Sequence, residues 1–504
     1  MKRTIVLLVF ICLGVVAASA QGTVPYPNPI KHVVLVIQEN RTPDNLFHGL
    51  LTYPGINPAN YDLASTGLAL VNGQEQTIPL TPIALATDFD LGHAHADFFV
   101  MYDNGKMDGA NQIPDSCNPH APDCKNGGQG QNLSYEYVQP SDVQPYLEMV
   151  AQYGWANLFF QTNQGPTFAA HQYLFSGTSA QDAESDAKGI LVAGNPQSTK
   201  GDNYIGLQDA GCLAPIDEFN YLVYPTSTRN LYKLTNDPLG SLCFNHDTLA
   251  TLLDDAGLSW KYYAPPMSGN PYPNDPTKKG YNPGGFIENA TNSFYSICQP
   301  DANYDTCNGP EYANNLDLNP PNVLTDISSC NLAVMNWVTP IGQASDHPGN
   351  INGGEGPSWV SAVVNAIGNN TNCDGAGYWS DTIIMVVWDD WGGWYDHEVP
   401  TISSGLWGDN EHGFRVPFVV VSAYTPQAYV SNQRSDFGSV VRFVEGVFGM
   451  GEGTLGFADA RASTDLSEFF NFKMKPRPFQ TISAPLNAEY FLNDKRVPDP
   501  PDDY

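Results

Sequence analysis

The fold is decided by the stretch His32-Val33-Val34-Leu35-Val36-Ile37, which is followed directly by Gln38-Glu39-Asn40-Arg41. Its apolar residues do not alternate with polar ones, and this pattern predicts a strand buried on both faces of a parallel sheet. Residues 382–388 form a second such run, which ends in Asp389-Asp390, and residues 417–422 form a third. Two of the predicted strands therefore end in acidic side chains.

Amphipathic helical patterns lie between and around these strands, at residues 145–154, 248–256, 358–367 and 438–448. Strands that alternate with helices predict an α/β sandwich, in which helices cover both faces of a mostly parallel central sheet. Ligands bind beyond the carboxyl ends of the strands in such sheets. We therefore expect the polar residues that follow the first two strands to meet, provided that those strands are neighbours.

The composition limits the function. The 504 residues are 42% hydrophobic, which is enough for a sizeable core, and the formal net charge is −31. Such an acidic surface repels nucleic acid and anionic membranes, so we expect neither as a partner. A small phosphate-ester or phospholipid head-group substrate remains compatible with this charge if a bound cation collects it locally.

The first residues have the pattern of an export signal. A basic start, an apolar run over residues 5–17 and the ending Ala18-Ser19-Ala20 predict a signal peptide at residues 1–20. We expect a secreted or periplasmic protein without a stable membrane anchor. Its catalytic domain is expected at residues 21–475.

Two segments of the chain are poor in regular patterns. Residues 264–321 are dense in Asn, Pro, Gly and Tyr, and they predict a loop-rich insertion over the site. Residues 476–504 are rich in Pro and predict an extended, exposed C-terminal tail.

Eight cysteines follow the predicted signal peptide, and an even number in an exported chain favours disulfides. Cys117 with Cys124 and Cys298 with Cys307 form natural local loops. The pairing of the other four stays open; they are Cys212, Cys243, Cys330 and Cys373. A structural zinc site is the alternative, but the chain has no Cys-x-x-Cys motif.

The pairs Glu39-Asn40 and Asp389-Asp390 are candidate metal ligands. At most strand ends such residues belong to a surface turn. For either pair taken alone, this interpretation competes with the interpretation as metal ligands. Adjacent carboxylates repel each other, however, and a cation is the usual compensation. An oxygen donor set with one amide suits a hard divalent cation such as Ca²⁺ or Mg²⁺.

Thr167 and His397 are further candidates. Thr167 follows Gly165-Pro166, where a threonine is usually a turn residue or a helix cap. The functional alternative is a nucleophile, because a metal lowers the pKa of a nearby hydroxyl and a helix N-terminus stabilises an incoming phosphate. His397 follows the second acidic pair and is a metal ligand, a phosphate contact or a structural buttress.

The ordered set of motifs resembles the bacterial phospholipase C and acid phosphatase family, a branch of the alkaline-phosphatase-like superfamily. The matching segments span roughly residues 30–450 and are His32 to Arg41, Tyr102 to Gly109, Gly165 to Thr167, Ser345 to Pro348, Asp389 to His397, and Arg415 to Phe418. The resemblance implies an alkaline-phosphatase-like sandwich. It also implies a divalent metal bound by Glu39, Asn40, Asp389 and Asp390.

The same resemblance assigns roles around the phosphate. Thr167 falls at the position of the nucleophile, and His347 is the candidate general acid. His93 and Lys106 are expected near the substrate. Many relatives read Pro-Asn-Arg where this chain has Ala170-His171-Gln172, so His171 is a candidate replacement for an arginine that contacts phosphate. Zinc stays open beside Ca²⁺ and Mg²⁺, since superfamily relatives often use it, although through histidines that these four positions lack.

These roles predict a secreted, metal-dependent phosphoric-ester hydrolase of the acid phosphatase type. A metal-activated Thr167 attacks phosphorus, and water then releases the covalent phospho-enzyme. One alternative is a phospholipase C that cleaves phosphatidylcholine-type phosphodiesters, although many such enzymes carry further C-terminal domains and this chain has about fifty residues after Met450. Outside the enzymes, the alternative is a secreted binding module stabilised by its metal.

Overall fold

The computed structural model describes residues 24–117, 132–195, 197–198, 211–214, 218–225, 232–235, 242–266, 287–302, 306–349, 352–402, 412–496, 498 and 501. The predicted signal peptide lies outside the described residues, as do Cys124 and much of the predicted insertion.

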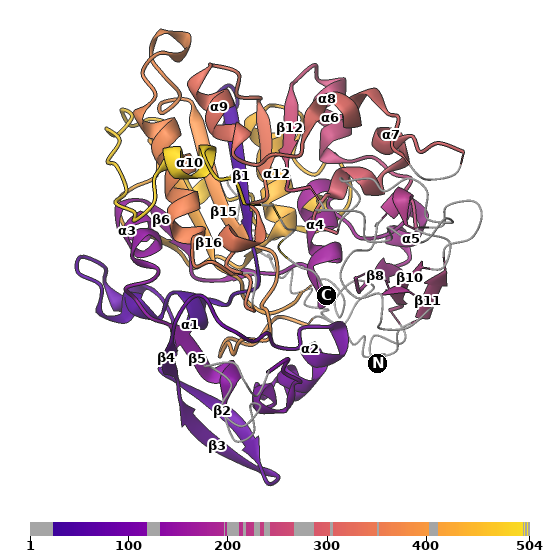
Figure 1. Ribbon diagram of the computed structural model, residues 1–504, viewed down its shortest axis with the longest axis vertical. Coiled ribbons are helices and arrows are strands. Elements are labelled where there is room, and N and C mark those ends of the chain that lie inside the picture. Colours follow the sequence, from indigo (N-terminus) through magenta and orange to yellow (C-terminus); the bar gives the residue numbers. More distant parts are fainter. Residues whose placement is uncertain are drawn as a thin grey trace, which may run out of the picture.

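An eight-stranded central sheet dominates the described part of the chain (Figure 1). Its spatial order is β13 (Leu316–Asp317), β12 (Trp260–Tyr263), β14 (Met335–Val338), β1 (His32–Gln38), β15 (Thr382–Trp388), β16 (Phe418–Ser422), β6 (Gly154–Ala156) and β17 (Tyr429–Ser431). Only β16 runs antiparallel to its neighbours, whereas the other pairs are parallel. The predicted mostly parallel sheet is confirmed.

Strands β1 and β15 form the centre of the sheet and lie side by side. Every residue of both strands is buried, as the unbroken apolar runs predict. Their parallel register runs from His32 opposite Thr382 to Gln38 opposite Trp388. The two strands therefore end level with each other, and the residues that follow them emerge at the same edge.

Helices cover both faces of the sheet (Figure 1). Helices α3 (Gln144–Gln152), α9 (Asn322–Ser328) and α10 (Gly356–Asn369) pack in one group, and α4 (Thr167–Ser176), α6 (Leu249–Asp255) and α12 (Phe437–Val447) pack in another. Four of these correspond to the predicted helices. Side-chain caps start two of them, Thr248 for α6 and Asp436 for α12.

The remaining elements are short. Further helices are α1 (Pro43–Leu46), α2 (His95–Tyr102), α5 (Ala183–Ala187), α7 (Tyr295–Cys298), α8 (Pro310–Asn315), α13 (Ala458–Arg461) and α14 (Ala488–Leu492). Small sheets pair β2 (Thr66–Val71) with β3 (Gln74–Pro79), β4 (Thr81–Ile83) with β5 (Glu136–Val138), and β7 (Phe159–Phe160) with β18 (Ser435–Asp436). A last sheet joins β8 (Leu191–Val192), β9 (Gln197–Ser198), β10 (Glu218–Val223) and β11 (Tyr232–Thr235).

Three disulfides connect the described residues, namely Cys212–Cys243, Cys298–Cys307 and Cys330–Cys373. The predicted local pair Cys298–Cys307 is confirmed, and two pairings that the sequence left open are now assigned. The predicted pair Cys117–Cys124 includes a cysteine outside the described residues. Among the described helices, none is both long enough and apolar enough to cross a membrane.

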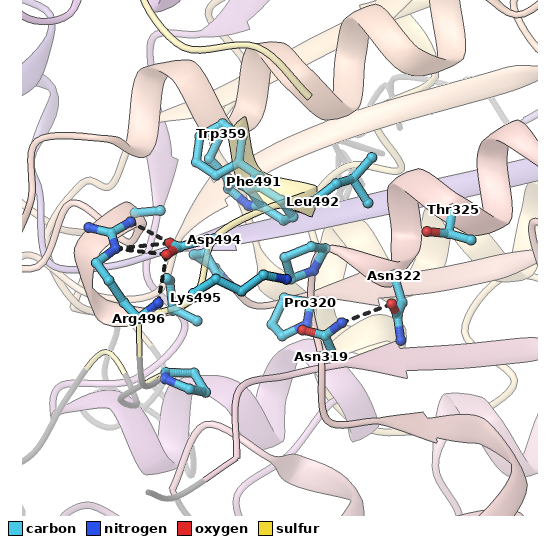
Figure 2. Close-up of a pocket in the computed structure, with 15 residues that line it drawn as sticks. Asn319, Pro320, Asn322, Thr325, Trp359, Phe491, Leu492, Asp494, Lys495 and Arg496 are labelled. Atoms are coloured by element: carbon cyan, nitrogen blue, oxygen red, sulfur yellow. Dashed lines mark hydrogen bonds and ion pairs between the residues drawn. The ribbon is translucent and has the colours of Figure 1, made fainter. Parts of the chain in front are cut away.

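The C-terminal tail differs from the prediction. Residues 476–487 are extended, as expected, but the tail then forms α14 and is not exposed throughout. Ile482 and Phe491 are buried. The backbone N–H and C=O of Ile482 form hydrogen bonds with the Asn365 side chain of α10, and the ring of Phe491 packs against Trp359. Apolar side chains thus dock the tail on the body of the protein, and a cavity of about 350 Å³ lies beneath it (Figure 2).

Candidate functional site

Three neighbouring strand ends build the site. Strand β14 leads to Ser345-Asp346-His347, β1 leads to Glu39-Asn40, and β15 leads to Asp389-Asp390. Backbone hydrogen bonds continue past the strands, from Glu39 N to Ser345 O at 2.8 Å and from Asp389 N to Gln38 O at 3.0 Å. The two acidic strand tips therefore meet, although about 350 residues separate them in the sequence.

Asp389 ties the two tips together. Its Oδ1 accepts hydrogen bonds from the backbone N–H of Asn40 at 3.1 Å and of Asp390 at 2.7 Å. Gly392 makes this close approach feasible, because it has φ +58° and a Cβ there would lie 2.4 Å from Asn40 O. The turn after β15 therefore requires glycine where the backbone of the first tip comes closest.

Asn40 is oriented by a histidine. Its side-chain Nδ2 donates to His93 Nε2 at 3.3 Å, while His93 Nδ1 donates to Leu91 O at 2.7 Å. This chain fixes the amide so that Nδ2 faces the histidine, and Oδ1 has no hydrogen-bond partner among the described residues. The predicted substrate contact His93 is thus a direct neighbour of a predicted metal ligand.

Helix α4 brings His171 to the tips. Thr167 is its first residue, and His171 lies four positions later on the same helix face. His171 Nε2 is 3.4 Å from Glu39 Oε1, and the potential ligand atoms of Glu39, His171 and Asp389 all lie within 4.8 Å of one another. We name Glu39, Asn40, His171, Asp389 and Asp390 the strand-tip cluster.

The strand-tip cluster and Thr167 are fully buried. Asn40 Oδ1, Asp389 Oδ2 and Thr167 Oγ1 are buried without a hydrogen-bond partner in the described part of the chain, and no described lysine or arginine pairs with Asp389. Buried carboxylates at such spacing need a compensating cation. The donor set therefore fits a divalent metal ion.

His347 is held by a network that the sequence analysis did not single out. Asp346 Oδ2 accepts hydrogen bonds from Tyr146 at 2.7 Å and from the Trp388 indole at 3.2 Å. Burial raises the pKa of Asp346 to about 6, against these hydrogen bonds and the charge of Arg41. His347 Nδ1 donates to Pro348 O at 2.6 Å, which fixes the orientation of the ring. The motif Ser345 to Pro348 contained Asp346, but its partners are distant in the sequence, with Tyr146 on helix α3 and Trp388 at the end of β15.

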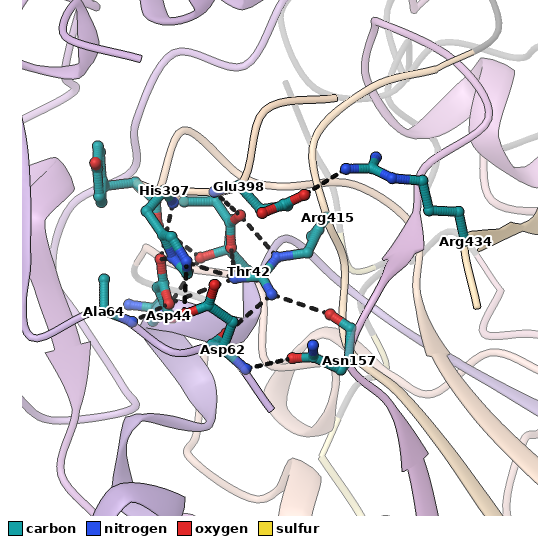
Figure 3. Close-up of polar contacts among 12 residues, drawn as sticks. Thr42, Asp44, Asp62, Ala64, Asn157, His397, Glu398, Arg415 and Arg434 are labelled. Atoms are coloured by element: carbon teal, nitrogen blue, oxygen red, sulfur yellow. Dashed lines mark hydrogen bonds and ion pairs between the residues drawn. The ribbon is translucent and has the colours of Figure 1, made fainter. Parts of the chain in front are cut away.

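A second buried group lies on the loops that follow the two tips (Figure 3). We name Asp44, Asp396, His397 and Arg415 the arginine cluster. Arg415 donates to both carboxylate oxygens of Asp396, at 2.8 and 3.0 Å, and lies 3.5 Å from Asp44. His397 Nδ1 donates to Asp44 Oδ2 at 2.7 Å.

The pKa values follow from these contacts. Burial opposes a charge on His397, but the hydrogen bond and charge of Asp44 outweigh it and raise the pKa of His397 to about 9. Burial raises the pKa of Asp396 to about 6, with Arg415 opposing the shift. Asp44, Asp396 and His397 also have the spacing of a metal site, but Arg415 already supplies a positive charge there.

Three of the predicted substrate contacts have the following positions in the structure. His397 belongs to the arginine cluster, and this position agrees with the alternative in which His397 is a structural buttress. Lys106 is 57% exposed and pairs with Asp103, and none of its described contacts involves the strand-tip cluster. His171, expected at the phosphate, instead faces the carboxylate of Glu39.

Comparison with known proteins gives one family. The family model described as Phosphoesterase family matches residues 30–451. The chain is 27% identical over 248 residues to phospholipase C B of Mycobacterium tuberculosis, which covers 45% of this chain and 43% of that protein. It is 26% identical over 319 residues to the non-hemolytic phospholipase C of Pseudomonas aeruginosa, covering 54% and 42%, respectively. In both matches the aligned region spans less than half the length of the relative.

A longer match joins the chain to phospholipase C A of Mycobacterium tuberculosis, at 23% identity over 512 residues, 94% of this chain and 84% of that one. Among solved structures, a protein in the alkaline phosphatase superfamily from Vibrio parahaemolyticus matches with a TM-score of 0.32 and 9% identity, covering 81% of this chain and 76% of that chain. The family match includes the whole strand-tip cluster and Thr167. The chain belongs to the phosphoesterase family.

Proposed function

We propose that the protein is a metal-dependent hydrolase of phosphoric esters, in which Glu39, Asn40, Asp389 and Asp390 hold a divalent cation and Thr167 is the nucleophile. One observation carries the proposal. The tips of β1 and β15 converge on the face of α4 that begins with Thr167, since Glu39 lies 3.4 Å from His171 one turn further along that helix. A buried hydroxyl one helical turn from a histidine that contacts a buried carboxylate supports metal-assisted phosphoryl transfer.

When bound, the cation would lower the pKa of the Thr167 hydroxyl and neutralise charge on the phosphate. Thr167 Oγ1 then attacks phosphorus in line, so that a new O–P bond forms while the bond to the leaving oxygen breaks and the hydroxyl proton passes to water. His347 Nε2 protonates the leaving oxygen. Water hydrolyses the phospho-threonine in a second displacement, and the N-terminus of α4 stabilises the phosphate charge in both steps.

We take a small phosphomonoester as the first substrate candidate. The strand-tip cluster and Thr167 have essentially no exposed surface, which suits a small ester better than a bulky lipid. The net charge of −31 also opposes docking on anionic lipid. A phosphodiester with a zwitterionic head group is the second candidate, because relatives over part or most of the chain are named phospholipases C.

The test compares p-nitrophenyl phosphate with p-nitrophenylphosphorylcholine, using purified mature protein with and without a chelator. We expect turnover of the first substrate, its loss on chelation and its return on adding a divalent cation. Preference for the second substrate would favour a phospholipase C over a phosphatase as the function of the protein. Turnover that survives complete metal removal would reject the metal-dependent mechanism.

The Thr167→Ala variant separates an enzyme from a metal-stabilised binding module. We expect it to fold and to bind the cation, yet to lose activity by roughly 10³-fold or more, whereas Thr167→Ser keeps a hydroxyl and stays within roughly tenfold of the wild type. Turnover in Thr167→Ala equal to that of the wild type would reject Thr167 as the nucleophile.

Export is part of the same proposal. The disulfides among the described residues favour an oxidising compartment. Expression from the full sequence should yield a mature protein that begins at Gln21 in the periplasm or medium. Recovery of the uncleaved chain in the cytosol would contradict this expectation.

A further inference from the structure

We infer that His171 is a fifth ligand of the cation proposed above, and that its nitrogen shifts the preference of the site from Ca²⁺ or Mg²⁺ toward a transition-metal ion such as Zn²⁺. The inference rests on the proposed function, because it assumes a cation between the strand tips. It assigns to His171 a role different from the phosphate contact expected from its sequence position.

The spacing is that of two ligands of one ion. His171 Nε2 lies 3.4 Å from Glu39 Oε1, and the ligand atoms of Glu39, His171 and Asp389 all fall within 4.8 Å of one another. With metal bonds of about 2.1 Å, neighbouring ligands of a five-coordinate ion lie about 3.0 to 3.6 Å apart. The histidine and the carboxylate are therefore already separated as they would be on a shared ion.

The tautomer of His171 supports the same role. Tyr262 donates its hydroxyl hydrogen to Glu288 O at 2.7 Å, because a backbone carbonyl oxygen can only accept a hydrogen bond. The Tyr262 oxygen can then only accept the hydrogen bond from His171 Nδ1, at 3.3 Å. With the ring hydrogen on Nδ1, Nε2 presents its lone pair to the strand tips.

This arrangement is the usual support of a metal-bound histidine. Such a histidine donates its second ring N–H to an oxygen that fixes the ring and its tautomer. Tyr262 provides that support from β12, and Glu288 provides it from a described part of the predicted insertion. Because Thr167 is one turn away on the same face of α4, the helix would hold the metal and the nucleophile together.

Nitrogen donors also discriminate among cations. Imidazole suits Zn²⁺ and other transition ions, whereas Ca²⁺ and Mg²⁺ take oxygen ligands. A site with one histidine and several carboxylates should thus bind Zn²⁺ well above Mg²⁺. The rival arrangement is an imidazolium that pairs with Glu39 and leaves the cation to oxygen ligands alone.

The experiment uses X-ray absorption of the full protein loaded with one equivalent of Zn²⁺. We expect imidazole multiple scattering in the wild type and its loss in His171→Asn, whereas His347→Asn keeps it. Calorimetry should show that Zn²⁺ affinity falls roughly 10- to 100-fold in His171→Asn while Mg²⁺ affinity changes by less than about 3-fold. Circular dichroism confirms that each variant is folded.

A milder variant keeps the test decisive if His171→Asn does not fold. Tyr262→Phe removes the support of Nδ1 but retains the ligand, and we expect a smaller loss of Zn²⁺ affinity with imidazole scattering retained. Imidazole scattering that is absent from the wild type, or unchanged in His171→Asn, would overturn the inference. Failure of the proposed function looks different, since Zn²⁺ binding would then be unaffected by Asp389→Asn.

Discussion

The strand-tip cluster and the arginine cluster are two buried acidic groups that arise from the same pair of loops. Asp44 lies five residues after Glu39, and Asp396 lies seven residues after Asp389. Arg415 and His397 neutralise Asp44 and Asp396 within the protein. At the strand tips, no described lysine or arginine pairs with Asp389, and Asn40 Oδ1 and Asp389 Oδ2 have no hydrogen-bond partner among the described residues.

This difference distinguishes a cluster that supports the fold from a cluster that serves metal binding and catalysis. A buried carboxylate that the protein neutralises itself is expensive to disturb and stabilises the loop that carries it. A buried carboxylate that the protein leaves to an added cation lowers stability until the cation binds, and such groups gather at functional sites. The arginine cluster should therefore govern folding, whereas the strand-tip cluster should govern metal binding and turnover.

The largest effect is expected from Arg415→Met. This variant leaves Asp44 and Asp396 buried beside a single histidine, and it should lower the free energy of unfolding by about 3 to 5 kcal/mol. Urea denaturation of the metal-free protein measures it. Arg434→Met is the matched control, because Arg434 pairs with Glu398 at the surface and should cost less than about 1 kcal/mol. Equal losses in the two variants would remove the distinction between the clusters.

A matched pair of isosteric changes sharpens the comparison. Asp396→Asn weakens the partner of Arg415 and should cost about 2 kcal/mol. Asp389→Asn in the metal-free protein removes one of several crowded charges and keeps the acceptor Oδ1, so it should stabilise the fold by up to about 1 kcal/mol. It should nevertheless abolish metal binding by calorimetry. A loss of stability in Asp389→Asn as large as in Asp396→Asn would break the comparison.

The pH dependence of stability tests His397. Its pKa rises from 6.5 to about 9 on folding, so the folded state holds a proton that the unfolded chain has lost. The contribution of His397 to the free energy of unfolding is complete below about pH 6.5 and disappears as the pH rises through about 9. We expect this contribution to be about 2 kcal/mol. Denaturation of the wild type and His397→Gln should give a difference that shrinks between pH 6 and pH 10. A difference that is constant over this range would contradict the ion pair with Asp44.

The smallest effect is expected from Gly392→Ala. The positive φ alone costs about 1 kcal/mol, and the added Cβ also pushes on Asn40 O, so metal affinity should fall by roughly tenfold. Gly73 in the β2–β3 turn has φ +75° with no atom near its missing Cβ. Gly73→Ala should therefore cost only the roughly 1 kcal/mol of the positive φ, less than Gly392→Ala, and leave metal affinity unchanged. Equal metal affinity in both variants would show that the close approach of the two tips does not determine metal affinity.

Much of the fold could be predicted because its central strands are long and uniformly apolar. Strands β1, β15 and β16 and four helices emerged from the local sequence patterns. Strands β12 and β14 did not, since each has only four residues and carries a polar residue, Lys261 and Asn336, respectively. The packing of the tail on the body of the protein was not predicted, because a Pro-rich composition does not show that a few apolar residues of the tail are buried.

The site was predictable only in part. The acidic pairs could be read from strand ends, but their meeting depends on a strand order that only three dimensions reveal. The pairing of Asp44 with Arg415 joins residues about 370 positions apart, and neither residue signals its partner. His171 was noticed as a departure from a motif, yet its direction depends on Tyr262 in a strand that the sequence did not indicate.

The docked tail reaches toward the reacting groups through a short chain of contacts. Arg496 binds both carboxylate oxygens of Glu355, at 2.8 and 2.7 Å, and the next residue, Gly356, packs so tightly on Asp346 that a Cβ would lie 2.0 Å from its Oδ1. Asp346 immediately precedes His347. Because Arg496 also lines the cavity beneath the tail, the tail, this cavity and Asp346 belong to one continuous packed unit.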